Sequence, residues 1–168
     1  MDLSKFRNLK SPYVLLLVGP PLSGKTFFYN KFISNIDNDV VLISRDEIVM
    51  EVYGSRNYEE AFSKVNQKKV DRLLDQRLED ANFQNKNVII DMTNMTSKRR
   101  KQNLDYFSDE YYKLCVIFPI LSDEEYIKRN KKRMEEENKN IPMSIIKRMI
   151  SYYQPIRPDE DFDKVISI

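Results

Sequence analysis

The sequence predicts an α/β protein: a three-layer α/β/α domain built on a mostly parallel sheet. Short apolar runs, of the length of buried strands, alternate along the chain with segments whose apolar residues recur at helical spacing. Strands that alternate with helices are typical of a parallel sheet that has helices on both faces. The 168 residues show no repeat and no linker, so we expect one domain over residues 1–168.

The first strand and the loop after it give the clearest pattern. Tyr13–Val18 is an apolar run that predicts a buried strand, and residues 19–26 have the Walker A pattern G-x-x-x-x-G-K-[ST]. Phe27, Phe28, Phe32 and Ile36 follow at helical spacing and predict a helix to about residue 34. A plain strand-to-helix turn is the alternative. Two of the chain's three glycines stand in this loop, which favours a phosphate-binding function.

We expect this phosphate loop (residues 19–26) to bind ATP or another nucleoside triphosphate. Backbone N–H groups of such a loop converge on phosphate oxygens, and the following helix N-terminus adds partial positive charge. The Lys25 ammonium would reach the β- and γ-phosphates, and the Thr26 hydroxyl would hold Mg²⁺. The predicted nucleotide-binding residues of the loop are Gly19, Pro21, Leu22, Ser23, Gly24, Lys25 and Thr26.

The rest of the chain continues the alternation. Residues 1–11 form a polar lead-in, and residues 40–43, 88–90, 111–118 and 164–168 are the further expected strands. A break at residues 54–57 precedes one long helix, with Phe62, Val65, Val70, Leu73, Leu74, Leu78 and Ala81 on one face. Later helices are expected near Thr96, from Ser122 because Ser122 and Glu125 form a capping box, and from Pro142, which suits a first turn.

Polar side chains follow two of the expected strands. Asp46 comes after the second strand and Asp91 ends the third, so both fall at the sheet edge that holds the phosphate loop. Asp46 is either a general base for an attacking hydroxyl or an ordinary helix N-cap, and the pattern does not decide between them. Asp91 either holds Mg²⁺, directly or through water, or forms a turn.

A basic helix is expected after Ser122. Arg129 and Arg133 lie one helical turn apart and, with Lys132, could fold over a triphosphate and neutralise charge in the transition state. The alternative is a solvated charged helix, which the many glutamates nearby favour.

Composition excludes several classes of function. The chain has no histidine, which excludes histidine-based catalysis and metal binding, and its single Cys115 allows no internal disulfide. A reducing cytoplasmic location is therefore expected. The apolar runs are too short to span a membrane, and the net charge of +2 does not by itself require a nucleic-acid partner. A GTPase is disfavoured because no Asn-Lys-x-Asp motif is present, and residues 161–163 are interpreted as an acidic tail.

Taken together, these motifs resemble the kinase domain of the polynucleotide 5′-hydroxyl kinases. The matching stretches, in the family's order, are residues 19–26, Arg45-Asp46, residues 88–94 with Arg99-Arg100, residues 128–133 and residues 141–149. The resemblance implies a P-loop kinase fold with a helical lid, ATP and Mg²⁺ as requirements, and DNA or RNA 5′-hydroxyl ends as partners. It implies that Asp46 is the general base and that Arg133, on the lid, stabilises the transferring phosphoryl group.

The resemblance also extends the expected site. Arg129 is assigned to nucleotide binding, and the expected substrate-binding residues are Arg45, Asp91, Thr93, Asn94 and Arg99. Two departures affect substrate contact: Val49 stands where phage members have an arginine that helps hold the substrate phosphate, and Met92 stands where they have an aspartate. No fused phosphatase domain is expected, so the chain would be a stand-alone kinase.

Two other functions stay open. One is a small-molecule kinase acting on a nucleoside, sugar or antibiotic, and the other is a nucleotide-binding regulator without transfer activity. The sequence also leaves open the choice between DNA and RNA, the preferred nucleoside triphosphate and whether the chain forms a homo-oligomer.

Overall fold

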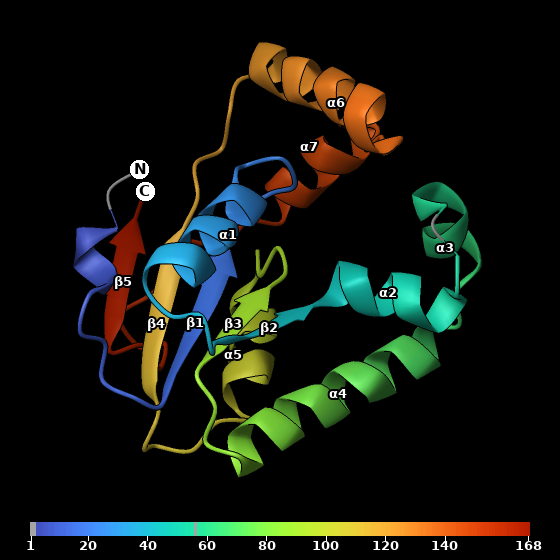
Figure 1. The fold of residues 1–168 in the computed structure, drawn as a ribbon. Coiled ribbons are helices and arrows are strands. Elements are labelled where there is room, and N and C mark those ends of the chain that lie inside the picture. The colour runs from blue at the N-terminus through green and yellow to red at the C-terminus, as the bar shows by residue number, and fades with distance from the viewer. Residues whose placement is uncertain (1–2, 56) are drawn as a thin grey trace.

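The protein is built around one parallel sheet with helices on both faces. The computed structural model describes residues 3–55 and 57–168. The sheet has the order β2-β3-β1-β4-β5, and every neighbouring pair is parallel (Figure 1). Its strands are β1 (Tyr13–Val18), β2 (Val41–Ser44), β3 (Val88–Asp91), β4 (Tyr112–Ile117) and β5 (Lys164–Ser167). The predicted three-layer α/β fold is therefore confirmed.

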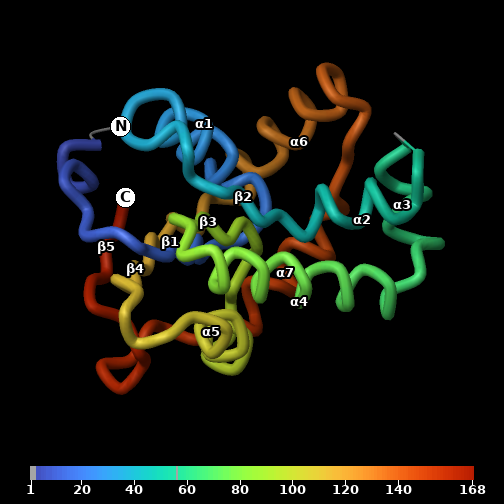
Figure 2. The backbone as a smooth tube through the Cα atoms, turned by 60° about the horizontal axis from the view of Figure 1, so that its bottom comes forward, coloured from blue at the N-terminus to red at the C-terminus, as the bar shows by residue number. Residues whose placement is uncertain are grey.

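The helices divide between the two faces and the edge of this sheet. They are the 3₁₀ helix η1 (Ser4–Phe6), α1 (Lys25–Asn35), α2 (Arg45–Tyr53), α3 (Tyr58–Lys64), α4 (Gln67–Phe83), α5 (Ser97–Leu104), α6 (Asp123–Glu137) and α7 (Met143–Ser151). Figure 2 shows the sheet between α1 on one side and α4 and α5 on the other. Helices α6 and α7, the lid, stand beyond the edge where the strands end (Figure 1).

Strand β1 shows why the sheet needs both layers. Its six residues are all buried, and successive side chains of a strand point to opposite faces. Leu16 therefore packs in a core with Leu74 and Leu78 of α4, whereas Leu15 packs in a second core with Phe28 of α1. A strand that is apolar on both faces is the pattern of a central parallel strand, as the sequence predicted.

Two predictions about local structure are wrong. The single long helix after residue 57 is two helices, because Val65 has extended backbone angles and Asn66 caps α4 by accepting a hydrogen bond from the Lys69 N–H. The polar lead-in is partly structured, since the buried Phe6 ring packs edge-on against Phe28 at 5.2 Å between centroids. Residues 1, 2 and 56, which belong to the lead-in and the predicted break, lie outside the described residues.

The lid has its own small core, formed by Tyr126, Ile141 and Ile146. Ser122 caps α6 by accepting from the Glu125 N–H, as the capping box predicted. The buried Asn130 side chain fastens the two lid helices, because its amide donates to the Ile141 carbonyl at 2.8 Å and accepts from the Ile141 N–H at 3.1 Å. Among the described helices, none has the length and apolar character that crossing a bilayer requires.

Candidate active site

The phosphate loop joins β1 to α1 and depends on its two glycines. A Cβ at Gly19 would lie 2.7 Å from Cβ of Phe118, which no side chain can tolerate. The Gly19 N–H donates to the Thr93 carbonyl at 2.9 Å, so the loop is attached to the segment after β3. Gly24 caps α1 with a φ of +105°, a backbone conformation that favours glycine. The glycines are thus required by close approach at one position and by backbone conformation at the other.

Lys25 is a buried cation inside this loop. Its Nζ donates to the carbonyls of Gly19 at 2.9 Å and Pro20 at 2.6 Å. Burial lowers the pKa of Lys25 to about 8, against the opposing effect of the Asp91 and Asp46 charges. These two carboxylates therefore lie close enough to act on the lysine electrostatically.

The loop fits a phosphate ligand. The Ser23 hydroxyl is buried and has no hydrogen-bond partner among the described residues, and buried polar atoms are normally paired. Thr26 is exposed in the first turn of α1, where its hydroxyl is accessible to a cation. Mg²⁺ in kinase sites is typically held by one or two protein oxygens together with substrate phosphates and water. A threonine hydroxyl beside a triphosphate site meets that requirement.

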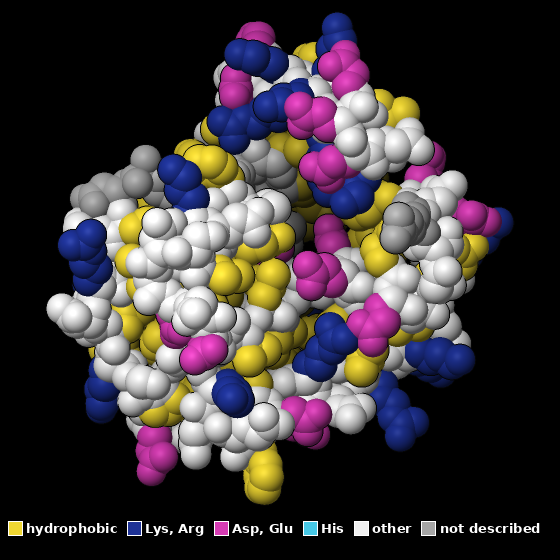
Figure 3. Space-filling view, viewed as in Figure 1, with side chains coloured by type: hydrophobic (Ala, Val, Ile, Leu, Met, Phe, Trp, Pro, Cys, Tyr) yellow, Lys and Arg dark blue, Asp and Glu magenta, His cyan; other side chains and the backbone are white. Residues whose placement is uncertain are grey.

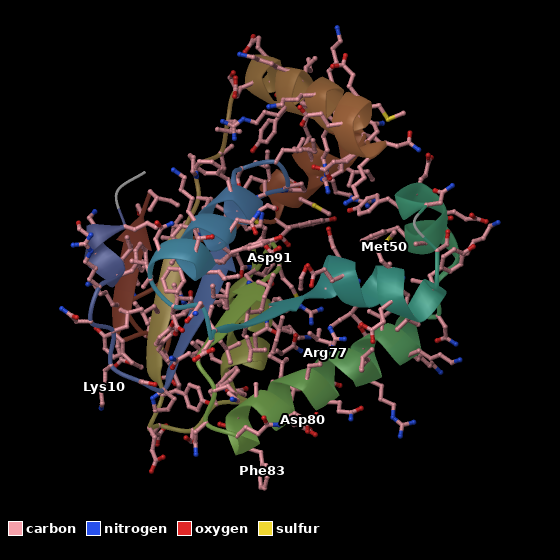
Figure 4. The ribbon with its side chains drawn as sticks, in the orientation of Figure 1. Lys10, Met50, Arg77, Asp80, Phe83 and Asp91 are labelled. Carbon is pink, nitrogen blue, oxygen red and sulfur yellow. The ribbon has the colours of Figure 1, made fainter. Side chains whose placement is uncertain are left out.

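Asp91 lies where three strand ends meet. It is in register with Leu17 of β1 and Ser44 of β2, and Figure 4 places it at the end of β3 beside the phosphate loop. Burial raises the pKa of Asp91 to about 6; the Lys25 charge opposes this rise, and the Asp46 charge adds to it. The sheet edge therefore gathers a carboxyl group, a lysine and a second carboxylate in one electrostatic environment.

Asp46 is exposed in the first turn of α2, and it is not the helix N-cap. The N-cap is Ser44, and the Asp46 carboxylate instead accepts a hydrogen bond at Oδ2 from the Tyr58 hydroxyl at 3.1 Å. The capping interpretation of Asp46 is therefore wrong. The Asp46 carboxylate is exposed and its charge acts on Lys25, so it is accessible to a hydroxyl that approaches the phosphate loop.

The lid brings one arginine onto the loop and a second one to Tyr58 of α3. Arg129 donates from Nη1 to the Leu22 carbonyl at 3.0 Å and from Nε to Glu125 at 2.6 Å. The Arg133 guanidinium carbon lies 5.4 Å from the Tyr58 ring centroid, and the Arg133 charge lowers the pKa of both Lys25 and Asp91. The alternative of a solvated charged helix holds for Lys132, whose side chain is 72% exposed beside Glu136.

Figure 3 shows the surface hollowed between the lid, α3 and the body of the molecule. Acidic side chains lie at the lower side of this hollow, and the lid side carries basic side chains with acidic ones among them (Figure 3). The hollow therefore lies between an acidic wall and a wall of mixed charge.

Asn94 has a structural function, which corrects its predicted function in substrate binding. Its side chain is buried, donates from Nδ2 to the Leu17 carbonyl at 2.8 Å and accepts at Oδ1 from Asn103 at 2.8 Å. No polar atom of the side chain is left for a ligand. Thr93, its neighbour, is half-buried and contributes its carbonyl to the Gly19 N–H.

Two predicted substrate-binding arginines face α4. Arg45 donates from Nη2 to Gln67 at 2.7 Å and to Asp71 at 3.1 Å. Arg99 is exposed and lines a groove of about 400 Å³ between α4 and α5, together with Asp75 and Tyr106. The structure thus places both side chains along α4 and gives neither a contact with the phosphate loop.

Sequence reasoning missed the functions of Arg100 and Tyr58. Arg100 is fully buried and donates to both carboxylate oxygens of Glu160 at 2.6 Å, and to the Asn94 carbonyl at 3.2 Å. Adjacent helical residues point in different directions, so Arg99 and Arg100 could not both face a substrate. Tyr58 belongs to none of the sequence motifs, so no pattern predicted its contact with Asp46.

The two departures from the family pattern are apolar core residues. Val49 is fully buried in the core on the α4 side of the sheet, and Met92 packs in the same core with 9% of its surface exposed. Neither position offers a polar group to the cleft. The arginine and aspartate that phage members have there find no counterpart at these two positions.

The family model described as an AAA domain, AAA_33, matches residues 14–156, so the chain belongs to this family. A solved structure titled as the Pnkp1/Rnl/Hen1 RNA repair complex contains a similar chain, with 27% identity and a TM-score of 0.67. That match covers 89% of this chain but 46% of the other, so this chain spans less than half the length of that relative. The chain is a P-loop kinase domain similar to that of polynucleotide kinases.

Two more distant structures share the fold alone. Kti12 of Chaetomium thermophilum, solved with ADP-AlF3, has 14% identity and a TM-score of 0.63, over 92% of this chain and 88% of that one. A gluconokinase from Sinorhizobium meliloti has 9% identity and a TM-score of 0.58, over 95% of this chain and 83% of that one. Kti12 and a gluconokinase therefore share this architecture, and the fold alone does not identify the acceptor.

Proposed function

We propose that this chain is an ATP- and Mg²⁺-dependent polynucleotide kinase that phosphorylates 5′-hydroxyl ends of DNA or RNA, as in end repair. The observation that most supports the proposal is that an exposed carboxylate, Asp46, and the lid arginine Arg133 both contact Tyr58, and both charges act on Lys25 of the phosphate loop. A positioned base and an arginine over the phosphates are the parts that phosphoryl transfer needs. The 27% identical chain from a structure titled as an RNA repair complex supports the choice of acceptor.

The donor is held by the phosphate loop. Backbone N–H groups of residues 22–26 and the Lys25 ammonium bind the β- and γ-phosphates, which replace the loop carbonyls as partners of Nζ. The Thr26 hydroxyl would hold Mg²⁺, which neutralises phosphate charge when bound. Arg129, already bonded to the Leu22 carbonyl, closes the lid side of the loop.

The acceptor reacts on the α2 side. The Asp46 carboxylate takes the proton of the 5′-hydroxyl as that oxygen forms a bond to the γ-phosphorus. The bond between the γ-phosphorus and the β–γ bridging oxygen breaks, and ADP leaves. Arg133 stabilises the charge that spreads over the transferring oxygens. Catalysis is then mainly positioning and charge neutralisation.

A small-molecule kinase is the second candidate, and one observation favours it. Few basic side chains are available to contact the phosphates of an acceptor strand, because Val49 is a buried apolar residue and Arg45 is paired with Asp71. A neutral sugar or nucleoside needs no phosphate contacts.

The deciding experiment measures transfer of labelled γ-phosphate from ATP to 5′-hydroxyl DNA and RNA oligonucleotides, against nucleosides, gluconate and aminoglycosides. We expect the oligonucleotides to be phosphorylated at least about 100-fold more efficiently, by kcat/KM, than any small acceptor. Preferential phosphorylation of a small acceptor would establish the second candidate instead.

The salt dependence of oligonucleotide binding gives an independent check. With a non-hydrolysable ATP analogue present, affinity should fall with a log–log slope of about −0.7 per phosphate contacted, corresponding to roughly one to three contacts. Arg99→Ala, which removes an exposed cation beside α4, tests whether the strand follows that groove. Affinity that does not change between low and physiological salt would contradict a polynucleotide acceptor.

A further inference from the structure

Tyr58 lies between the α2 side of the cleft and the lid. It is the first residue of α3, and Figure 1 shows α3 standing beyond α2 and facing the end of α6. Its hydroxyl donates to Oδ2 of Asp46 at 3.1 Å. Its ring has the Arg133 guanidinium carbon 5.4 Å from the centroid and Lys139 Nζ at 5.5 Å. One side chain thus contacts the proposed base and two cations of the lid.

These contacts use both chemical properties of a tyrosine. The hydroxyl is a donor toward an ionised carboxylate, a stronger type of hydrogen bond than one between neutral groups. The ring face attracts cations that lie within about 6 Å of its centroid. Burial raises the pKa of Tyr58, the Asp46 charge raises it further and the Arg133 charge opposes this, so the hydroxyl stays a donor across the physiological range.

Other residues of α3 pack on the core and anchor the helix, whereas Tyr58 contacts Asp46 and the lid. Ala61 is fully buried in the core on the α4 side, and Phe62 packs against that core. The Tyr58 ring packs against the Phe62 ring with centroids 4.3 Å apart and a tilt of 34°, which restricts its orientation. Asn57 caps the helix by accepting from the Glu60 N–H. A short capped helix with a buried inner face therefore presents one aromatic side chain to the base and the lid.

We propose that Tyr58 is a positioning residue that couples the base to the lid: its hydroxyl orients Asp46, and its ring holds Arg133 over the phosphate loop. The base is then correctly oriented in the arrangement in which the lid arginine is in place. This inference rests on phosphoryl transfer at this site, as in the proposed function, but not on the acceptor being a polynucleotide.

Two substitutions separate the hydroxyl, which interacts with the Asp46 and Arg133 side chains, from the ring face. Tyr58→Phe removes the hydroxyl and keeps the ring, and we expect kcat to fall about 10-fold, as for a hydrogen bond to a charged group. Tyr58→Leu also removes the ring face, and kcat should fall about 50-fold. The KM for ATP should stay within about 3-fold in both variants, because Tyr58 contacts no residue of the phosphate loop in the described structure.

Tyr13→Phe is the matched control. The Tyr13 hydroxyl also donates to an aspartate, Asp37 at 2.5 Å, but Tyr13 begins β1 at the sheet edge opposite the phosphate loop. Its kcat should stay within about 2-fold of wild type. Thermal unfolding checks that all variants are folded. If Tyr58→Leu is unstable, the test rests on Tyr58→Phe, which keeps the ring.

A double-mutant cycle tests whether Tyr58 acts through Asp46. In the Asp46→Asn background, measured by single-turnover transfer, adding Tyr58→Phe should reduce the rate by less than about 2-fold, because the base is already absent. A full 10-fold further loss would show that the effects are independent and would overturn the proposal. A Tyr58→Phe enzyme with wild-type kcat would overturn it as well.

The acceptor panel keeps this result distinct from the proposed function. All ratios are measured on the acceptor that the wild-type chain phosphorylates best. If that acceptor is a small molecule, the polynucleotide proposal fails while the Tyr58 ratios still decide the positioning proposal. If the wild-type chain phosphorylates nothing in the panel, both proposals fail.

Discussion

The two sides of the cleft are held in different ways. On the donor side, Lys25 is buried and fixed by backbone groups, as its bonds to two loop carbonyls show. On the acceptor side, Asp46 and Arg133 are held by side chains, through Tyr58 and a 3.5 Å contact to Glu137. Buried backbone contacts cost more to break than partly exposed side-chain contacts. The donor side is therefore preorganised, and the acceptor side can adapt to its ligand.

The largest effect is expected from Asp46→Asn, on the acceptor side. The amide keeps the shape and can still accept from Tyr58, but it cannot take the proton, so kcat should fall about 10²–10⁴-fold. Nucleotide binding and the free energy of unfolding should change little, since Asp46 is exposed and first-turn charges contribute only about 0.3–1 kcal/mol.

Glu47→Gln is the control, because Glu47 is also exposed in the first turn of α2 and loses the same charge. Steady-state kinetics and calorimetric ATP binding separate the two outcomes. If the kcat of Asp46→Asn is nearly that of wild type, or equals that of Glu47→Gln, Asp46 is not the general base.

A somewhat smaller loss is expected from Lys25→Met, on the donor side. Removing a charge that interacts with the phosphates in the transition state should reduce kcat about 10²–10³-fold. Stability should be unchanged or higher, because replacing a buried charge by an apolar side chain is often stabilising. Urea unfolding would measure that change.

Lys31→Met, at an exposed lysine of the same helix that lies 5.0 Å from the Phe27 ring centroid, controls for loss of a lysine from α1. Marked destabilisation of Lys25→Met would show that the buried Lys25 charge stabilises the fold, and would contradict this prediction.

Asp91→Asn is expected to have the smallest effect, which is a change in the free energy of unfolding. Burial raises the pKa of Asp91 from 3.8 to about 6, so the folded state binds the proton more tightly than the unfolded state does. Wild-type stability should therefore fall as pH rises through this range, and the asparagine variant should not show that fall. Above pH 6 the variant should be more stable by roughly 1–2 kcal/mol, with the difference vanishing near pH 4.

Asp37→Asn should show the opposite sign. Burial raises the pKa of Asp37, but hydrogen bonds from Tyr13 and Asn87 outweigh this effect and hold the pKa below its usual value. Its removal should therefore destabilise the fold at neutral pH, and this loss should shrink in acid. Chemical denaturation at several pH values compares the two variants, and equal behaviour of both would contradict the assigned burial of Asp91.

Part of the lid could be predicted from the sequence, and part could not. The cap at Ser122 follows from residues three apart, so the local pattern was sufficient. The junction between the two lid helices was not predictable in this way, because Asn130 bonds to Ile141 across eleven positions. Both residues lie in stretches that match the family pattern, and the structure gives the physical link between them.

The sequence by itself determined the sheet, the phosphate loop and the place of Asp46 and Asp91 at the strand ends. These follow from apolar periodicity and from short-range geometry, which neighbouring residues specify. Only the tertiary structure decided which polar side chains are free for chemistry. Arg100 is buried because Glu160, sixty positions away, meets it, and Tyr58 contacts Asp46 and Arg133 because three helices converge there. Burial and pairing depend on segments remote in the chain, and no local pattern contains that information.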